Sequence, residues 1–196
     1  MVKAYSPLES HSLRPNTTYR QPVQPEARRV TPEDAAVEVM TDFRLVRAIT
    51  VPASVSIEYA RQRMRSNRIH LLLVTSDRNT ILGLITSTDI EGEKPLQHMQ
   101  KRGVRRDEIM VSDIMTPLER LEAVLMDDVL RARVGHIVAT LEAAGRRHTM
   151  VIERDHAGRQ LVRGLFAVSQ LNRQLGTAIE PIETARSFAE AVLAYS

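Results

Sequence analysis

The sequence LLLVTSDRNTILGLITSTD, residues 71–89, decides the fold class. Two apolar runs, 71–74 and 81–85, lie on either side of Asp77-Arg78-Asn79, whose residue types favour a turn. The apolar runs are continuous rather than alternating, which is typical of strands in a sheet covered by helices. A Thr and an Asp follow the second run at the spacing of a helix start. The stretch therefore predicts a strand, a turn, a second strand and a helix.

The same order of features returns in residues 150–170, MVIERDHAGRQLVRGLFAVSQ, with a turn at 155–158. Each stretch follows a segment with apolar residues at helical spacing, and each such segment follows a short apolar strand, near 46–51 and near 123–126. The helical positions are Ile57, Ala60 and Met64 in the first copy and Val134, Ile137, Val138 and Leu141 in the second. The sequence therefore predicts an α/β (α+β) fold of two β-α-β-β-α repeats. Because one such unit exposes an apolar face, we expect the two to pack on each other with pseudo-two-fold symmetry.

The remaining segments are placed around these repeats. The predicted division is a flexible arm at 1–30, a first repeat at 31–92, a basic linker at 93–108, a second repeat at 109–176 and a final helix at 177–196. Thr31, Pro32 and Asp34 have the spacing of a helix start, with Thr31 as the N-cap. A short helix is expected at 95–100 in the linker, and Gly176 is expected to end the helix before it.

Composition excludes several classes of function. The 196 residues contain no Cys, which excludes disulfides, thiolate metal sites and cysteine nucleophiles. The six His residues show no ligand spacing, and the sequence has neither a Walker loop nor a nucleophile elbow, so we expect no metal site and no enzyme. With only three Phe and four Tyr, aromatic platforms for nucleic acid are not expected either.

The chain also carries no sign of a membrane protein. No apolar run approaches the ~20 residues that span a bilayer, and residues 1–20 are too polar for a signal peptide. We therefore expect a cytoplasmic protein without a membrane partner. The net charge of +3 favours anionic partners only weakly.

The segment from Gly83 to Asp89 has two interpretations. Thr86 and Asp89 are spaced as a capping box, which satisfies free helix amides without any ligand, and spacing alone favours this interpretation. The alternative uses the same geometry for binding. The Asp89 carboxylate would accept hydrogen bonds from both hydroxyls of a ribose, Thr86 would support the sugar, and Thr88 would reach a phosphate.

The repeat, the strand-turn-strand unit and the Gly-x-x-Thr-x-x-Asp ending together resemble a tandem pair of CBS (cystathionine-β-synthase-type) domains, the Bateman module. The resemblance covers about residues 33 to 176. It implies a regulatory, non-catalytic module that binds adenosine-containing ligands such as AMP, ADP, ATP or S-adenosylmethionine in clefts between the repeats. It also implies that two such pairs assemble into a homodimer.

The resemblance further implies which residues line the two clefts. In the first cleft, Thr86, Thr88 and Asp89 would face Thr116, Leu121, Arg147 and His148. Leu121 and the backbone near His148 would line the adenine pocket, and Arg147 would lie on the phosphate side. In the second cleft, Ala167 and Gln170 replace the hydroxyl and the carboxylate, and Thr41, Val46, Ile69 and His70 would form the other wall. We expect this second cleft to bind weakly or to be empty. His70 and His148 occupy similar places before the central strands of the two repeats.

Two functions follow from these observations. The first is a regulatory sensor that binds an adenine nucleotide, AMP or ATP above all, as a regulatory ligand rather than a cofactor. It would signal through its dimer arrangement to a separate downstream protein of unknown identity. The alternative is a structural or protein-interaction module whose nucleotide sites have decayed, which Ala167 and Gln170 favour.

Overall fold

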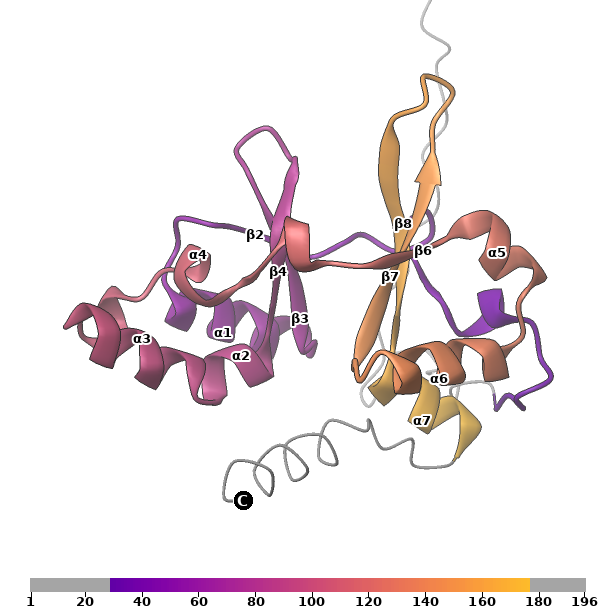
Figure 1. Cartoon of the computed structure of the whole chain (residues 1–196), viewed down its shortest axis with the longest axis horizontal. Helices are drawn as coiled ribbons and strands as arrows, with labels where there is room; N and C mark the ends of the chain where they lie inside the picture. Colours follow the sequence, from indigo (N-terminus) through magenta and orange to yellow (C-terminus); the bar gives the residue numbers. More distant parts are fainter. Residues whose placement is uncertain (1–28, 177–196) are drawn as a thin grey trace, which may run out of the picture.

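The computed structural model describes residues 29–176 and contains two four-stranded sheets, each with helices packed against it (Figure 1). The first half contains β2 (Thr50–Pro52), α1 (Ile57–Asn67), β3 (Leu71–Thr75), β4 (Ile81–Thr86), α2 (Ser87–Glu91), α3 (Lys94–Arg102), η2 (Arg106–Glu108), α4 (Val111–Ile114) and β5 (Thr116–Pro117). The second half contains η1 (Ala36–Val39), β1 (Thr41–Asp42), β6 (Ala123–Leu125), α5 (Met126–Arg131), α6 (Val134–Ala143), β7 (His148–Arg154), β8 (Gln160–Ala167) and α7 (Val168–Leu175).

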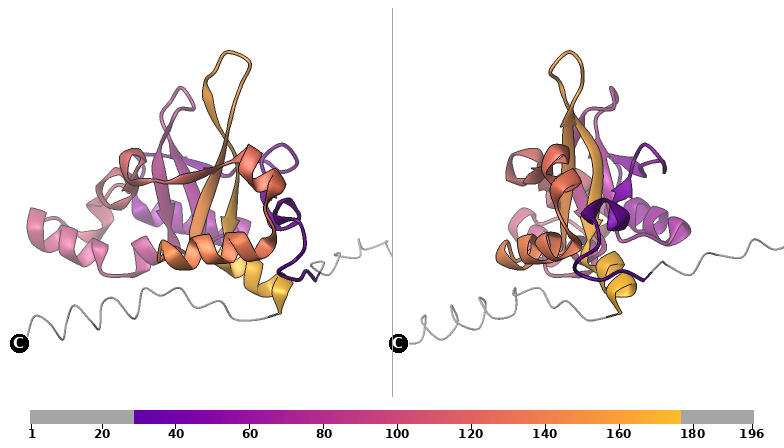
Figure 2. Two further views of the ribbon diagram at one scale, coloured as in Figure 1. Left: turned by 45° about the vertical axis from the view of Figure 1, so that its right-hand side comes forward. Right: turned by 90° about the vertical axis from the view of Figure 1, so that its right-hand side faces the viewer.

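The two sheets share one topology. Their strand orders are β2-β3-β4-β5 and β6-β7-β8-β1, and in each the first pair is parallel and the other two pairs are antiparallel. The two hairpins, β3-β4 and β7-β8, stand next to each other at the centre of the molecule, with the helices toward the outside (Figures 1 and 2). The predicted α/β fold of two related β-α-β-β-α repeats is confirmed.

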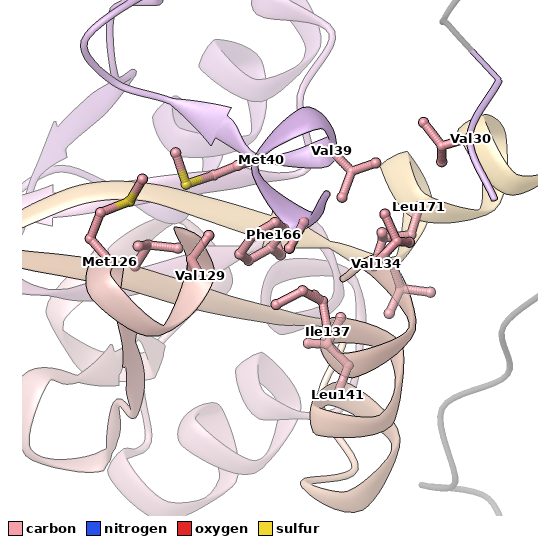
Figure 3. Close-up of a cluster of buried hydrophobic side chains, with 13 residues drawn as sticks. Val30, Val39, Met40, Met126, Val129, Val134, Ile137, Leu141, Phe166 and Leu171 are labelled. Atoms are coloured by element: carbon pink, nitrogen blue, oxygen red, sulfur yellow. The ribbon is translucent and has the colours of Figure 1, made fainter. Parts of the chain in front are cut away.

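The first segment of each repeat packs in the other half. Strand β1 is the first strand of the repeat at 31–92 but pairs with β8, and β5 is the first strand of the repeat at 109–176 but pairs with β4. Val30, Val39 and Met40 belong to the same buried cluster as Phe166, in the core of the second half (Figure 3). In the same way, Ile109, Val111 and Ile114 are buried in the first half's core. The sequence repeats at 31–92 and 109–176 thus exchange their first segments, and the chain crosses between the halves at 43–49 and 118–122, the latter containing the short helix η3 (Leu118–Arg120).

A glycine lies opposite each exchanged strand, Gly83 of β4 opposite β5 and Gly164 of β8 opposite β1. A Cβ on Gly83 would lie 2.4 Å from the carbonyl oxygen of Thr116, and a Cβ on Gly164 would lie 2.4 Å from that of Thr41. No side chain fits at such a distance, so glycine is required by the close approach of two backbones. The pairs Gly83-Leu84 and Gly164-Leu165 in the sequence therefore mark the two places where β5 and β1 pack against a neighbouring strand.

Strand β1 is also held by a buried ion pair. The Arg163 guanidinium of β8 bonds the Asp42 carboxylate, and the two side chains are only 9% and 14% exposed. Glu153 lies on the other side of Arg163, with its Oε2 3.1 Å from Nε. The hydrogen bond from Arg163 holds the pKa of Asp42 below its usual value. The first half has the apolar Leu82 where the second has Arg163, so only β1 is secured in this way.

Two local predictions were wrong. Thr31 does not begin a helix, because its N–H and hydroxyl both bond Asp34 Oδ2 in a turn, at 2.6 and 3.0 Å, and η1 begins only at Ala36. The backbone here bonds the second half instead, with Ala36 N–H donating to Ala132 O at 3.0 Å. The strand expected at 46–51 is confined to Thr50–Pro52, because the residues before it form the crossing segment.

Other local predictions were confirmed. The linker helix is α3, and Gly176 caps α7 with a φ of 69°. Residues 1–28 of the predicted arm and the final helix at 177–196 lie outside the described part of the chain; Val30, predicted to lie in the arm at 1–30, is buried. Within residues 29–176, no helix has the length and apolar character needed to cross a bilayer.

The strand crossings give a stability prediction. Gly83→Ala and Gly164→Ala should each lower the free energy of unfolding by about 1–3 kcal/mol, because the added methyl group displaces the crossing strand. Gly135→Ala is the matched control, since its Cβ would lie 3.4 Å from Pro32 O near the start of α6, and it should be neutral or raise stability by about 0.5 kcal/mol. Urea unfolding measures all three, and equal stability of Gly83→Ala and Gly135→Ala would contradict the close crossing.

Candidate functional site

A cavity of about 1030 Å³ lies between the two halves. All the residues assigned to the two clefts from the sequence line this one cavity: Thr86, Thr88, Asp89, Thr116, Leu121, Arg147 and His148 for the first cleft, and Thr41, Val46, Ile69, His70 and Gln170 for the second. The structure therefore brings both predicted clefts together as two parts of a continuous space. Their binding of a ligand stays a prediction.

The Thr86 and Asp89 pair forms the capping box at the point where β4 becomes α2. The Thr86 N–H and hydroxyl both donate to Asp89 Oδ2, at 2.8 and 2.7 Å, and the Asp89 N–H donates back to Thr86 Oγ1 at 3.2 Å. The cap interpretation of this motif is thus confirmed. It also fixes the carboxylate on the wall of the cavity, where its side chain is 12% exposed.

The other carboxylate oxygen of Asp89 is paired with Lys94. Lys94 Nζ lies 2.5 Å from Asp89 Oδ1 and donates to the carbonyl oxygen of Ile114 at 3.3 Å. The Lys94 side chain is 45% exposed, so the ion pair has one buried and one solvated member. Sequence reasoning placed Lys94 in a basic linker and missed this contact. The available signal was its position at the start of the linker helix, shortly after the Thr-x-x-Asp motif.

Thr116 is placed differently from the expected wall. It pairs with Leu84 in β4, so it lies in the same sheet as Thr86 rather than across the cavity from it. Thr41 likewise pairs with Leu165 of β8, the strand that leads into α7 with Gln170, so it lies on the same side as Gln170 rather than across from it. The opposite wall of the first cleft consists of Arg147 and His148, where β7 begins, and of Leu121 in the crossing segment.

The His148 imidazole is half-buried and electrostatically coupled to both walls. Burial lowers the pKa of His148 below its usual value; Asp89 across the cavity raises this pKa, and Arg147 and Arg146 lower it. The lowered pKa favours a neutral ring at neutral pH. A neutral, partly buried ring next to an exposed arginine provides a flat, weakly polar surface beside a positive charge.

His70 and His148 are not equivalent, contrary to the sequence interpretation. The strand register pairs Leu71 with Thr86 and His148 with Ala167, so His148 corresponds to Leu71, and His70 corresponds to Arg147. His70 is exposed, with its Nδ1 3.4 Å from Ser87 Oγ. A difference of one residue along a strand moves a side chain to the other face of the sheet, which short motifs do not reveal.

The part of the cavity around Gln170 lacks the capping box. Ala167 makes no side-chain cap for α7, and Gln170 Oε1 accepts a hydrogen bond from Thr41 Oγ1 at 2.8 Å. The amide oxygen that replaces the carboxylate is thus already bonded within the protein.

Comparisons with known proteins point to one family. Residues 35–93 match the family model described as CBS domain. The CBS domain-containing proteins CBSCBSPB3 and CBSCBSPB1 of Arabidopsis thaliana are 23% and 27% identical to the chain, over 86% and 69% of its length. The chain spans about a third or less of these curated relatives, 32% and 26% of their lengths.

Two solved structures are similar in fold. The CBS-domain containing protein ATU1752 from Agrobacterium tumefaciens has a TM-score of 0.52 at 16% identity, covering 81% of this chain and 98% of that one. An uncharacterized conserved protein from Pyrococcus horikoshii has a TM-score of 0.50 at 21% identity, covering 71% of this chain and 89% of that one. Both support the fold described above.

The His148 environment gives a prediction in pH. Arg147→Ala should raise the pKa of His148 and Asp89→Asn should lower it, because each removes one of the charges that act on the ring. Because the pKa is lower in the folded chain than in the unfolded one, the unfolded chain binds more protons just below pH 6.5, and stability should fall as the pH falls through this range. Histidine NMR titration and unfolding at several pH values measure both effects, and shifts of the same sign in the two variants would contradict this arrangement.

Proposed function

This chain belongs to the CBS-domain family as a tandem pair, and on that premise we propose that it is a regulatory module that binds an adenosine-containing nucleotide between its two repeats. The observation that carries the proposal is the position of the Thr86–Asp89 box on the wall of the cavity between the halves, with Arg147 and His148 opposite. A carboxylate held in place by a cap is ready to accept hydrogen bonds from a ribose diol without reorganising.

The sugar has to compete with Lys94 for Asp89. Oδ2 already accepts two hydrogen bonds from Thr86, so a ribose hydroxyl would bond mainly Oδ1, where Lys94 now lies. Because the Lys94 side chain is 45% exposed, water can solvate its ammonium once it is displaced, and the ribose hydroxyl takes its place on Asp89. The Lys94 side chain therefore yields to the ligand at small cost.

The opposite wall supplies contacts of the kind that a base and a phosphate require. Leu121 and the neutral ring of His148 offer a weakly polar surface for adenine. Arg147 is exposed beside them and presents a guanidinium for a phosphate. The ligand would thus contact the first half through its sugar and the second half through its base and phosphate.

A ligand that contacts both halves can act as a signal. If the nucleotide binds one arrangement of the two halves more tightly, it shifts the population toward that arrangement. In the proposed function this shift changes how two CBS pairs assemble, and a separate protein responds to the change.

A structural or protein-interaction module is the second candidate. The bond between Thr41 and Gln170 and the ion pair between Lys94 and Asp89 favour it, because both satisfy candidate ligand-binding groups within the protein. Nucleotide binding by the unaltered protein, and by Asp89→Asn with its control Asp113→Asn, distinguishes the two candidate functions.

Replacing Asp89 tests the sugar contact. Asp89→Asn keeps an oxygen for the Thr86 cap but removes the charge, and it should weaken AMP or ATP binding by about 10- to 100-fold, as expected for the loss of charged hydrogen bonds. Asp113→Asn is the matched control, because Asp113 Oδ2 caps Met110 N–H at 2.8 Å outside the cavity. Calorimetry with AMP, ADP, ATP and S-adenosylmethionine provides the measurement. If none binds the unaltered protein below millimolar concentration, the interaction module is the better description.

Replacing Lys94 tests the competition for Asp89. Lys94→Met should tighten nucleotide binding by about two- to fivefold, because it removes the ion pair that the ribose has to displace. Lys101 lies on the same helix but forms no ion pair with Asp89, so Lys101→Met should leave affinity unchanged. Weaker binding by Lys94→Met would show instead that the ammonium assists the ligand.

A further inference from the structure

Arginines surround the cavity, but carboxylates lie at only one of its two ends. Its lining contains six arginines and, within residues 29–176, two carboxylates. Arg120, Arg146 and Arg147 lie at the first cleft, together with both carboxylates, Asp89 and Glu122. Arg146 Nη1 pairs with Glu122 Oε2 at 2.9 Å, and Asp89 pairs with Lys94. Most of the negative charge in this end is therefore balanced inside the protein.

The end of the cavity around Gln170 is lined by positively charged side chains and, among the described residues, by no carboxylate. Arg47 follows Val46 in the crossing segment, Arg68 precedes Ile69 at the end of α1, and Arg173 lies one turn after Gln170 on α7. None of these three guanidiniums forms an ion pair with a carboxylate of residues 29–176. Three like charges that line one cavity repel each other, and an anion bound among them relieves that repulsion.

Resting on the nucleotide site proposed above, we propose that the Gln170 end of the cavity is a subsite for a phosphate chain, so that the ligand is a nucleoside di- or triphosphate rather than a monophosphate. The guanidinium fork matches two phosphate oxygens at once, and the three arginines are exposed enough to turn toward a chain. The sugar and base occupy the Asp89 end, and the terminal phosphates extend toward Arg47, Arg68 and Arg173.

The same end is poorly equipped for a second nucleoside. Ala167 offers no hydroxyl, and the Gln170 amide oxygen already accepts the Thr41 hydroxyl. Within residues 29–176, the Gln170 end therefore lacks the groups that would bind a second ribose, and its arginines without ion pairs suit an anion instead. The cavity volume of about 1030 Å³ lies just above the ~300–1,000 Å³ range of ligand pockets, which leaves room for a chain beyond one nucleoside.

An affinity series tests the subsite. Calorimetry with AMP, ADP and ATP at fixed salt and with EDTA should show affinity rising along the series, by at least about tenfold from AMP to ATP, with a steeper salt dependence for ATP. The double variant Arg47→Gln/Arg173→Gln should reduce ATP affinity to that of AMP and leave AMP affinity unchanged. Arg102→Gln/Arg154→Gln removes two exposed arginines outside the cavity and should leave the whole series unchanged. Circular dichroism melting checks that each variant is folded.

Inorganic tripolyphosphate separates this inference from the function on which it rests. If AMP binds but ATP binds no better, or if the double variant leaves the ATP preference intact, the subsite is overturned and the nucleotide site stands. If no adenosine ligand binds but tripolyphosphate binds and the double variant abolishes this binding, the anion subsite stands and the nucleotide function falls. If neither AMP nor tripolyphosphate binds, both proposals fall.

Discussion

The pairing of two exchanged edge strands holds the two halves of this protein together. β1 and β5 are each only two residues long, yet each joins the sheet of the other repeat. The glycines opposite them allow the backbones to approach closely, because a Cβ at either position would collide with the crossing carbonyl oxygen. The exchange places Thr41 and Thr116 on the cavity walls and leads the two crossing segments along its edge. The geometry of the candidate site therefore depends on backbone contacts that carry no side-chain chemistry of their own.

The two halves differ in their side chains at corresponding positions. Strand β1 is fixed by the buried pair of Arg163 and Asp42, whereas the corresponding place in the first half holds Leu82. At the cavity the first half has the additional polar contacts, because it keeps the Thr86–Asp89 box where the second half has Ala167 and Gln170. A duplicated unit can thus keep one fold while its two copies diverge in charge. The backbone contacts preserve the fold, and the side chains around the cavity are free to change.

Local patterns in the sequence predicted the hairpins, the main helices and the capping box, because each depends on residues close together in the chain. Helical spacing alone predicted the buried face of α1 with Ile57, Ala60 and Met64. The spacing of a cap alone predicted the contact between Thr86 and Asp89. What the sequence did not reveal depends on how the helices and strands are placed relative to one another. The turn at Thr31 replaces a helix because Ala36 bonds Ala132, and Lys94 reaches Asp89 across a break between two helices. The offset of His70 from His148 appears only in the strand register.

The two interpretations of the Thr86–Asp89 motif are compatible once the atoms are assigned separately. One carboxylate oxygen serves the helix cap, and this fixes the orientation of the group. The other oxygen is paired with Lys94, whose side chain is nearly half exposed, so water can take over the solvation of its ammonium when a hydroxyl displaces it. A cap that engaged both oxygens would leave nothing for a ligand, and an uncapped carboxylate would have to be ordered when the ligand arrived. Because the cap engages only one oxygen, local stability and ligand binding can depend on the same residue without opposing each other.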